Sequence, residues 1–260
     1  MRMTSIEDWR TDRQQSVAQT QGDLALIGLH TIADPMQIEG IPGWWAPNME
    51  NGSGLTLRAA ASEQITVDGQ VVDGIVTLDI DYSIVRFSET LTAVATAQPG
   101  SNHLLAVYDT NAVAMNTYEG ISYFPFDSEW VIQAEFIKDD NHRTMAFTHN
   151  SDSDGNVRHH QSPGDITFIK EGVSYRLTPF TSGNVLIIVF GDVTNGKESY
   201  GMGRMLLVEP EDNGLVTLDF NKSFLPPCAF SYHFNCPLPP AHHRLPFEVT
   251  AGEMQVIFRS

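Results

Sequence analysis

The chain has 260 residues, of which 42% are hydrophobic and 18% are charged, a composition typical of a folded globular protein with a sizeable core. Asp and Glu number 32 against 15 Lys and Arg, which gives a formal net charge of -17. A surface this negative repels phosphate groups, so the charge argues against general nucleic-acid binding and against docking on anionic lipids.

The N-terminal segment predicts a helix from about Ser5 to Gln21. Ser5 and Asp8 resemble a capping box, and apolar residues then recur at helical spacing. The stem of Arg13 falls on the same side, where it can cover apolar surface. Because only a narrow face of this helix is apolar, we expect it to lie on the outside of the domain.

We expect no targeting leader, because acidic residues such as Glu7 and Asp12 are unlike a secretory or mitochondrial signal. The longest apolar runs, Leu24–Leu29 and Val185–Phe190, are too short to cross a bilayer. These features favour a cytoplasmic protein that does not contact membranes.

Two stretches follow the expected helix. Leu24–Leu29 either continues the helix or docks as a separate turn. Residues 38–53 are rich in Pro, Gly and Trp and predict an ordered loop. The adjacent Trp44 and Trp45 exclude a simple linker, because tryptophans are rarely left in water.

From Leu55 onward the pattern is β. Turn signals such as Asp68-Gly69 recur at roughly ten-residue spacing, which is typical of an antiparallel sandwich or barrel. Val185–Phe190 is continuously apolar and predicts a strand buried on both faces. The other expected strands are 55–58, 65–67, 71–72, 75–80, 83–87, 91–95, 104–108, 130–137, 144–148, 166–169, 173–177, 205–208, 215–220, 247–249 and 254–258.

These elements predict a mostly β protein built from antiparallel sandwich or barrel-like sheets. We expect an N-terminal helical segment over residues 1–30 and a β-rich domain over residues 31–260, with a subdivision near residues 111–120. The proline-dense segment Leu225–Pro246 predicts a rigid, extended wrap over the core.

Asn150–Gly155 resembles the opening of a calcium loop, with oxygen ligands at alternate positions before a glycine. The twelfth position is Gln161 instead of Glu, so the bidentate carboxylate is missing, and strands flank the loop where helices are required. A polar hairpin tip is the favoured interpretation.

Cys228, His233, Cys236 and His243 have the residue types of a zinc site, but their spacing matches no zinc pattern. In a reducing cytoplasm the two cysteines are most simply free thiols, with a Cys228–Cys236 disulfide as the alternative. The glycines of Tyr200–Arg204 precede a strand where a dinucleotide site requires a helix. We therefore expect no metal and no cofactor.

The second half contains a long, ordered series of motifs: Phe190-Gly191-Asp192, Thr194, Gly196, Tyr200-Gly201-Met202-Gly203-Arg204, Leu218-Asp219-Phe220-Asn221, Pro226-Pro227-Cys228-Ala229-Phe230, Cys236-Pro237-Leu238-Pro239-Pro240, Arg244-Leu245 and Ala251-Gly252-Glu253. With these motifs the second half strongly resembles a bacterial and archaeal family of unknown function, and the resemblance weakens before about residue 120. The chain departs from the family pattern at Met202, where glycine is usual, and at His243, where asparagine is expected.

The polar residues of these motifs form the candidate ligand-binding set. In one interpretation, the two arginines of the set line a pocket and hold a carboxylate or phosphate, with an aspartate beside them. In the other, which we favour, the same side chains form a buried network that pins the wrap to the core. The candidates are Asp192, Tyr200, Arg204, Asp219, Asn221, Arg244 and Glu253.

Three functions remain open from the sequence. The best supported is binding of a small polar or anionic ligand in a β-rich pocket. A hydrolase that uses Asp192 or Asp219 is the second, although the sequence contains no known nucleophile motif. A protein-interaction module without a small-molecule site is the third, and an apolar patch around Trp44 and Trp45 would favour it.

Overall fold

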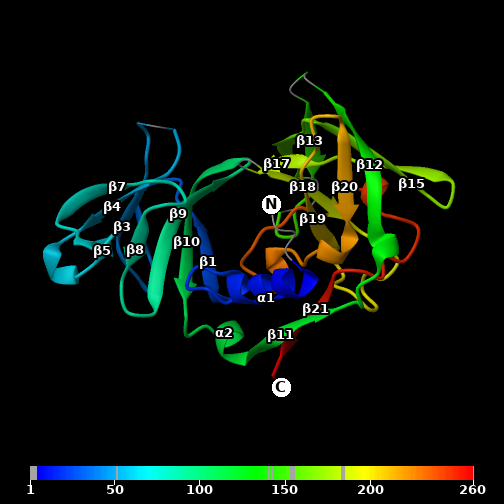
Figure 1. Ribbon diagram of the computed structural model, residues 1–260. Coiled ribbons are helices and arrows are strands. Elements are labelled where there is room, and N and C mark those ends of the chain that lie inside the picture. Colours follow the sequence, from blue (N-terminus) through cyan, green and yellow to red (C-terminus); the bar gives the residue numbers. More distant parts are fainter. Residues whose placement is uncertain are drawn as a thin grey trace. The chain divides into compact units, whose positions relative to one another are not determined.

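The computed structural model describes residues 5–50, 52–139, 141, 143–152, 156–182 and 185–259. Its contacts divide the chain into two compact units. The small unit is Ser16–Thr117, and the large unit joins Met1–Gln15 to Tyr118–Ser260. Both units consist mainly of antiparallel strands, which confirms the expected fold class (Figure 1).

The small unit is a sandwich of a six-stranded and a four-stranded sheet, in the orders β1-β10-β9-β8-β5-β6 and β2-β3-β4-β7. Leu57 and Leu78 from the smaller sheet share one buried core with Val85 and Leu105 from the larger. The strands are β1 (Leu26–Thr31), β2 (Met36–Ile38), β3 (Ile41–Pro47), β4 (Leu55–Ala59), β5 (Thr66–Val67), β6 (Gln70–Val71), β7 (Gly74–Leu78), β8 (Ile84–Arg86), β9 (Leu91–Gln98) and β10 (Ser101–Asp109).

Two early segments differ from the sequence-based expectation. Leu24–Leu29 neither continues the helix nor forms only a turn, because Leu26 begins β1 and pairs with β10. A short apolar run has the same pattern in a helix and in a strand, so the sequence alone does not distinguish the two. Here the pairing with β10 makes the run a strand. The stretch expected as an ordered loop contains the strand β3, whose Trp45 is fully buried while Trp44 is 36% exposed.

The large unit contains four sheets, whose strand orders are β16-β15-β12-β20, β17-β18-β19, β11-β21 and β13-β14. The strands are β11 (Tyr118–Tyr123), β12 (Val131–Lys138), β13 (Thr144–Phe147), β14 (Arg158–Gln161), β15 (Gly164–Lys170), β16 (Val173–Leu177), β17 (Phe180–Ser182), β18 (Val185–Phe190), β19 (Arg204–Val208), β20 (Leu215–Asp219) and β21 (Glu253–Phe258).

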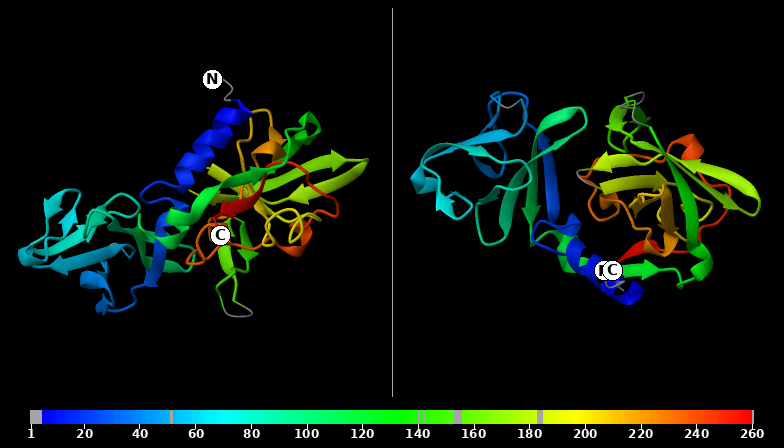
Figure 2. Two further views of the ribbon diagram at one scale, coloured as in Figure 1. Left: turned by 90° about the horizontal axis from the view of Figure 1, so that it is seen from below. Right: turned by 45° about the horizontal axis from the view of Figure 1, so that its top comes forward.

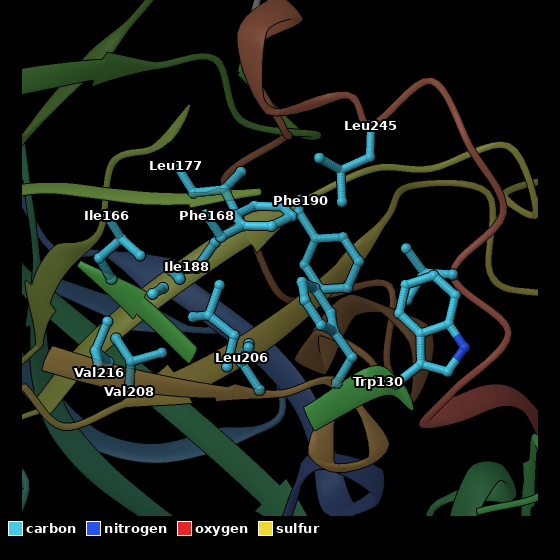
Figure 3. Close-up of a cluster of buried hydrophobic side chains, with 14 of the residues drawn as sticks. Trp130, Ile166, Phe168, Leu177, Ile188, Phe190, Leu206, Val208, Val216 and Leu245 are labelled. Carbon is cyan, nitrogen blue, oxygen red and sulfur yellow. The ribbon is translucent and has the colours of Figure 1, made fainter. Parts of the chain in front are cut away.

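The strand β18 is covered on both faces, as its continuous apolar run predicts. Ile188 and Phe190 point into the main core, where Figure 3 shows them among side chains from β15, β19 and β20. Val189 points the other way and packs with Phe147 of β13 and Phe180 of β17. The three-stranded sheet is therefore the middle layer of the large unit.

The N-terminal helix α1 (Ile6–Val17) begins where the capping pattern predicts and ends before Gln21. The hydroxyl of Ser5 accepts a hydrogen bond from the amide of Asp8 at 3.0 Å. The guanidinium of Arg13 lies 5.2 Å from the rings of both Phe224 and Phe230, so its stem covers apolar surface. Figure 2 shows α1 in blue from two further directions.

The proline-dense segment is the expected wrap, interrupted by the short turns η5 (Pro227–Ala229) and η6 (Ala241–His243). The carbonyl of Cys236 accepts the amide of Asn150 at 3.1 Å, which fixes the wrap to the loop after β13. Residues 247–249 were expected as a strand but have no strand pairing, because the backbone of Val249 bonds to side chains instead.

The remaining helical elements are short. They are α2 (Val113–Thr117), η1 (Asp23–Ala25), η2 (Ala61–Glu63), η3 (Ser128–Trp130) and η4 (Phe220–Lys222). Among the residues that the structure describes, no helix combines the length and the apolar character that a membrane crossing requires.

Candidate functional site

Arg204, the first residue of β19, is the centre of a buried polar network. Its side chain is fully buried. One terminal nitrogen donates to the Asp192 carboxylate at 2.8 Å and to the carbonyl of Val249 at 2.7 Å. The other donates to the carbonyls of Ala251 and Glu253. A single guanidinium therefore holds the segment that leads into β21.

Asp192 follows β18 and has donors on both carboxylate oxygens. One oxygen accepts from Arg204, and the other accepts from the Thr194 amide at 2.8 Å, the Thr194 hydroxyl at 2.6 Å and the Val249 amide at 3.3 Å. With these donors in place, Asp192 has little capacity left to accept a proton from a substrate. The arrangement favours the structural interpretation over a catalytic one.

Burial is the main influence on the Arg204 guanidinium. It lowers the pKa of Arg204, and the Asp192 carboxylate opposes this by favouring the charged form. An arginine keeps its charge at neutral pH even so. The pair is therefore ionic, and the carbonyl groups around it compensate the loss of water.

Glu253 extends the network to the N-terminal helix. One carboxylate oxygen accepts the Leu225 amide at 2.7 Å, and the other lies 3.1 Å from Nε of Arg13. Arg13 also donates to the carbonyl of Leu225 at 3.0 Å. Burial, and then the negative charge of Glu253, raises the pKa of Tyr118 to about 12. The carboxylate thus joins α1, the wrap and β21.

Tyr200 contacts the wrap through its hydroxyl. The hydroxyl donates to the carbonyl of Cys228 at 3.1 Å and lies 3.7 Å from the sulfur of the same residue. The amide of Cys228 in turn lies 3.3 Å from the sulfur of Cys236, and both residues are thiols that form no disulfide. Burial raises the pKa of Tyr200, so the phenol stays protonated and remains a donor.

Asp219, Asn221 and Arg244 have other contacts. The Asn221 amide group donates to the carbonyl of Asp127 at 2.9 Å and to the Asp219 carboxylate at 3.1 Å, which closes the turn after β20. Arg244 is exposed beside Gly191. The contacts therefore join Asp192, Arg204 and Glu253, whereas Asn221 bonds to Asp127 before β12 and the Asp219 carboxylate bonds to Asn221.

The metal alternatives find little support in the described part of the chain. No group of three or more His, Cys, Asp or Glu side chains is placed there to hold a metal. His243 is fully buried, with its ring nitrogens engaged by the Thr178 amide and the Val189 carbonyl. Asp152 is bound by Arg158, which lowers the pKa of that carboxyl to about 2. The rest of the calcium-like loop, residues 153–155, lies outside the described residues.

A hollow of about 450 Å³ lies in the small unit, at residues that the sequence-based candidates do not include. Arg58 on β4 stands opposite Trp44 on β3, and its guanidinium lies 5.6 Å from the indole ring. The residues that line the hollow are Gln37, Gly43, Trp44, Arg58, Ala59, Ala60, Glu63, Asp73 and Gly74.

Arg58 has no ion pair among the described residues, although two carboxylates line the same hollow. Glu63 instead accepts the backbone amide of Ala60 at 2.7 Å, and Asp73 accepts that of Ala61 at 3.3 Å. The carboxylates are thus oriented by the turn that follows β4.

Arg58 is distinguished in the sequence by its charge, because it lies in a strongly acidic segment with few lysines or arginines. It and Arg86 are the sole lysine or arginine residues between Ser16 and Thr117. The acidic residues of the same segment are Asp23, Asp34, Glu39, Glu50, Glu63, Asp68, Asp73, Asp79, Asp81, Glu89 and Asp109.

Comparison with known proteins concerns mainly the large unit. No curated protein matches the chain. It is 32% identical to an uncharacterized protein of Haloarcula marismortui with a solution structure, over 52% of this chain and 76% of that one, with a TM-score of 0.43. Residues 116–254 match the family model described as "Protein of unknown function (DUF1684)". The chain therefore belongs to the DUF1684 family.

Proposed function

We propose that this protein binds a small polar ligand with an anionic group in the hollow formed by Trp44 and Arg58. The observation that carries the proposal is a guanidinium 5.6 Å from the centre of an indole ring in a hollow, without an ion pair in the described part of the chain. In this proposal the Asp192–Arg204–Glu253 network of the large unit has a structural role.

The chemistry of the hollow defines the class of ligand. The planar guanidinium of Arg58 matches a carboxylate or phosphate, which it can bind through two parallel hydrogen bonds. The exposed part of Trp44 offers an aromatic face to the body of the ligand. Glu63 and Asp73 repel a second negative charge, so a ligand with one anionic group and polar or cationic substituents fits best.

Calorimetric titration of the full chain with sodium benzoate tests the proposal, because benzoate combines a carboxylate with a ring. Benzyl alcohol is the uncharged control. We expect benzoate to bind and benzyl alcohol to bind at least ~10-fold more weakly, because only the carboxylate can pair with the guanidinium.

Variants of the two arginines of the small unit complete the test. Arg58→Gln is expected to abolish benzoate binding. Arg86→Gln removes the same charge from the same unit, at a position where the described residues place no aromatic ring against the guanidinium, and should leave binding unchanged. Equal losses in both variants would mean that net charge controls binding, and unchanged binding by Arg58→Gln would place the site elsewhere.

A further inference from the structure

The small unit has a second hollow along an open edge of its sandwich. The strand β7 is the last strand of the four-stranded sheet, and β6 is the last strand of the six-stranded sheet. A groove of about 420 Å³ runs beside these two edges. Its lining is Val67, Asp68, Gln70, Val71, Val72, Asp73, Ile75, Val76, Thr77, Asp79 and Ser83.

The backbone of β7 is paired on one side. Residues 74–78 are in register with β4, from Gly74 opposite Ala59 to Leu78 opposite Leu55. No other backbone hydrogen bond of residues 74–78 is present among the described residues. Alternate amide and carbonyl groups of an edge strand point away from its partner, so β7 presents unpaired donors and acceptors toward the groove.

The side chains of the groove combine apolar and acidic character. Val71 of β6 is 58% exposed and Ile75 of β7 is 73% exposed, although both are large aliphatic residues that line the same groove. Three carboxylates, Asp68, Asp73 and Asp79, line the groove, and no lysine or arginine does. Its potential is therefore negative, and exposed aliphatic side chains lie beside the carboxylates.

We propose that this edge groove binds an extended, positively charged segment of a partner protein, which adds to β7 as a further strand. Backbone pairing to β7 gives affinity for any extended chain, and alternate side chains of that chain face the same side. Apolar residues of the segment contact Val71 and Ile75, and lysine or arginine residues reach the three aspartates. The groove shares Asp73 with the Trp44–Arg58 hollow, but Val71 and Ile75 do not line that hollow, and the inference does not depend on the function proposed for it.

Charge distinguishes this occupant from a second copy of the chain. Edge strands of two identical molecules can pair, but each groove here carries Asp68, Asp73 and Asp79. Pairing two such edges would bring like charges together in both molecules, and the net charge of -17 adds to the repulsion. A cationic segment instead neutralises the repulsion among the three aspartates of one groove when it binds.

Fluorescence anisotropy of a labelled peptide in which lysine and valine alternate provides the test. The matched probe has glutamate in place of lysine. We expect the lysine peptide to bind the full chain, with affinity that falls as salt is added, and the glutamate peptide not to bind. Amide resonances of residues 74–78 are expected to shift when the lysine peptide is added, because strand addition changes their hydrogen bonding.

Two lysine substitutions test the location of the site. Ile75→Lys and Val71→Lys each place a positive charge in the groove and should weaken binding by at least ~10-fold. Ile169→Lys is the control, because Ile169 is 67% exposed on β15 of the large unit. Equal binding of the two peptides, absence of binding, or equal effects of all three variants would overturn the proposal. Concentration-dependent dimerisation that Ile75→Lys abolishes would also overturn it, since the occupant would then be a second copy.

Discussion

The carboxylate of Asp192 lies 2.8 Å from the guanidinium of Arg204, and neither side chain is exposed to solvent. The two residues stand at the ends of neighbouring strands, with Arg204 opposite Phe190 in the register of β18 and β19. Arg204 also satisfies three backbone carbonyls in the segment 249–253. The pair therefore fixes an irregular segment, in which the Ala251 carbonyl also accepts the Ser223 hydroxyl at 3.3 Å.

Substitution of Arg204 tests the structural role of this network. Arg204→Lys keeps the charge but cannot reach Asp192 and three carbonyls at once, so we expect it to lower the free energy of unfolding by about 3 kcal/mol. Lys222→Met is the control, because Lys222 is 41% exposed in its ion pair with Asp219 and should cost less than about 1 kcal/mol. Urea denaturation measures both. Similar small losses would show that the buried network contributes little.

Gly252 is expected not to tolerate a side chain, because the backbone of Ser223 lies close to it. Its φ is +81°, and a Cβ there would lie 2.5 Å from the carbonyl oxygen of Ser223. Gly196 has a similar φ of +77° but open space around it. We expect Gly252→Ala to destabilise the protein by about 2 kcal/mol more than Gly196→Ala, because backbone strain is common to both. Thermal or urea unfolding of both variants measures the difference, and equal losses would contradict the close approach.

The ion pair between Arg13 and Glu253 is expected to hold α1 against the large unit. Arg13→Met keeps much of the apolar stem and removes the charge, which leaves Glu253 buried with one donor fewer. Limited proteolysis should then cut within α1 faster than in the wild-type protein. Gln15→Ala alters an exposed residue of the same helix and should not change the rate. Unchanged cleavage in Arg13→Met would show that packing alone retains the helix.

Stability is expected to fall as the pH drops from about 6.5 toward 4, because histidines are buried in neutral form. Burial, the largest cause, and nearby positive groups lower the pKa of His160 from 6.5 to about 4. Between these two pH values His160 binds a proton in the unfolded chain but not in the folded chain. The folded state is therefore destabilised relative to the unfolded state as the pH falls through this window, and no such loss occurs above pH 6.5.

His160→Leu should reduce this pH dependence by about 2 kcal/mol across the window. His159→Gln removes only the smallest of the causes that lower the pKa of His160, from an exposed neighbour on β14, and should leave most of the pH dependence in place. Urea denaturation at several pH values measures both variants. A steep dependence that persists in His160→Leu would assign the effect to other groups, such as the buried His149 and His243, whose pKa values burial also lowers.

Strands with strong apolar patterns could be predicted from the sequence, and β18 and β20 are examples. The strand β14 could not, because its residues Arg158–Gln161 are polar and become a strand through pairing with β13. The strand β3 was hidden by its prolines, since Pro42 lies next to the β2–β3 turn, where a missing amide is tolerated.

The candidate site was predictable in part. The residue types of Asp192, Arg204 and Glu253 suggested a buried network, and their contacts agree with that interpretation. The partnership of Glu253 with Arg13 depends on how the N-terminal helix docks, which no local pattern encodes. Arg58 became a candidate only when the register of β3 and β4 placed it against Trp44.

The most direct test of the account is a map of benzoate binding on the wild-type chain by nuclear magnetic resonance. We expect the largest shifts at the Trp44 indole and at the amides and Nε group of Arg58, with resonances of Arg204 and Glu253 unchanged. Shifts centred on Arg204, Arg244 or Asp219 would contradict the account, because they would place the ligand site in the DUF1684 region and make its polar residues functional instead of structural.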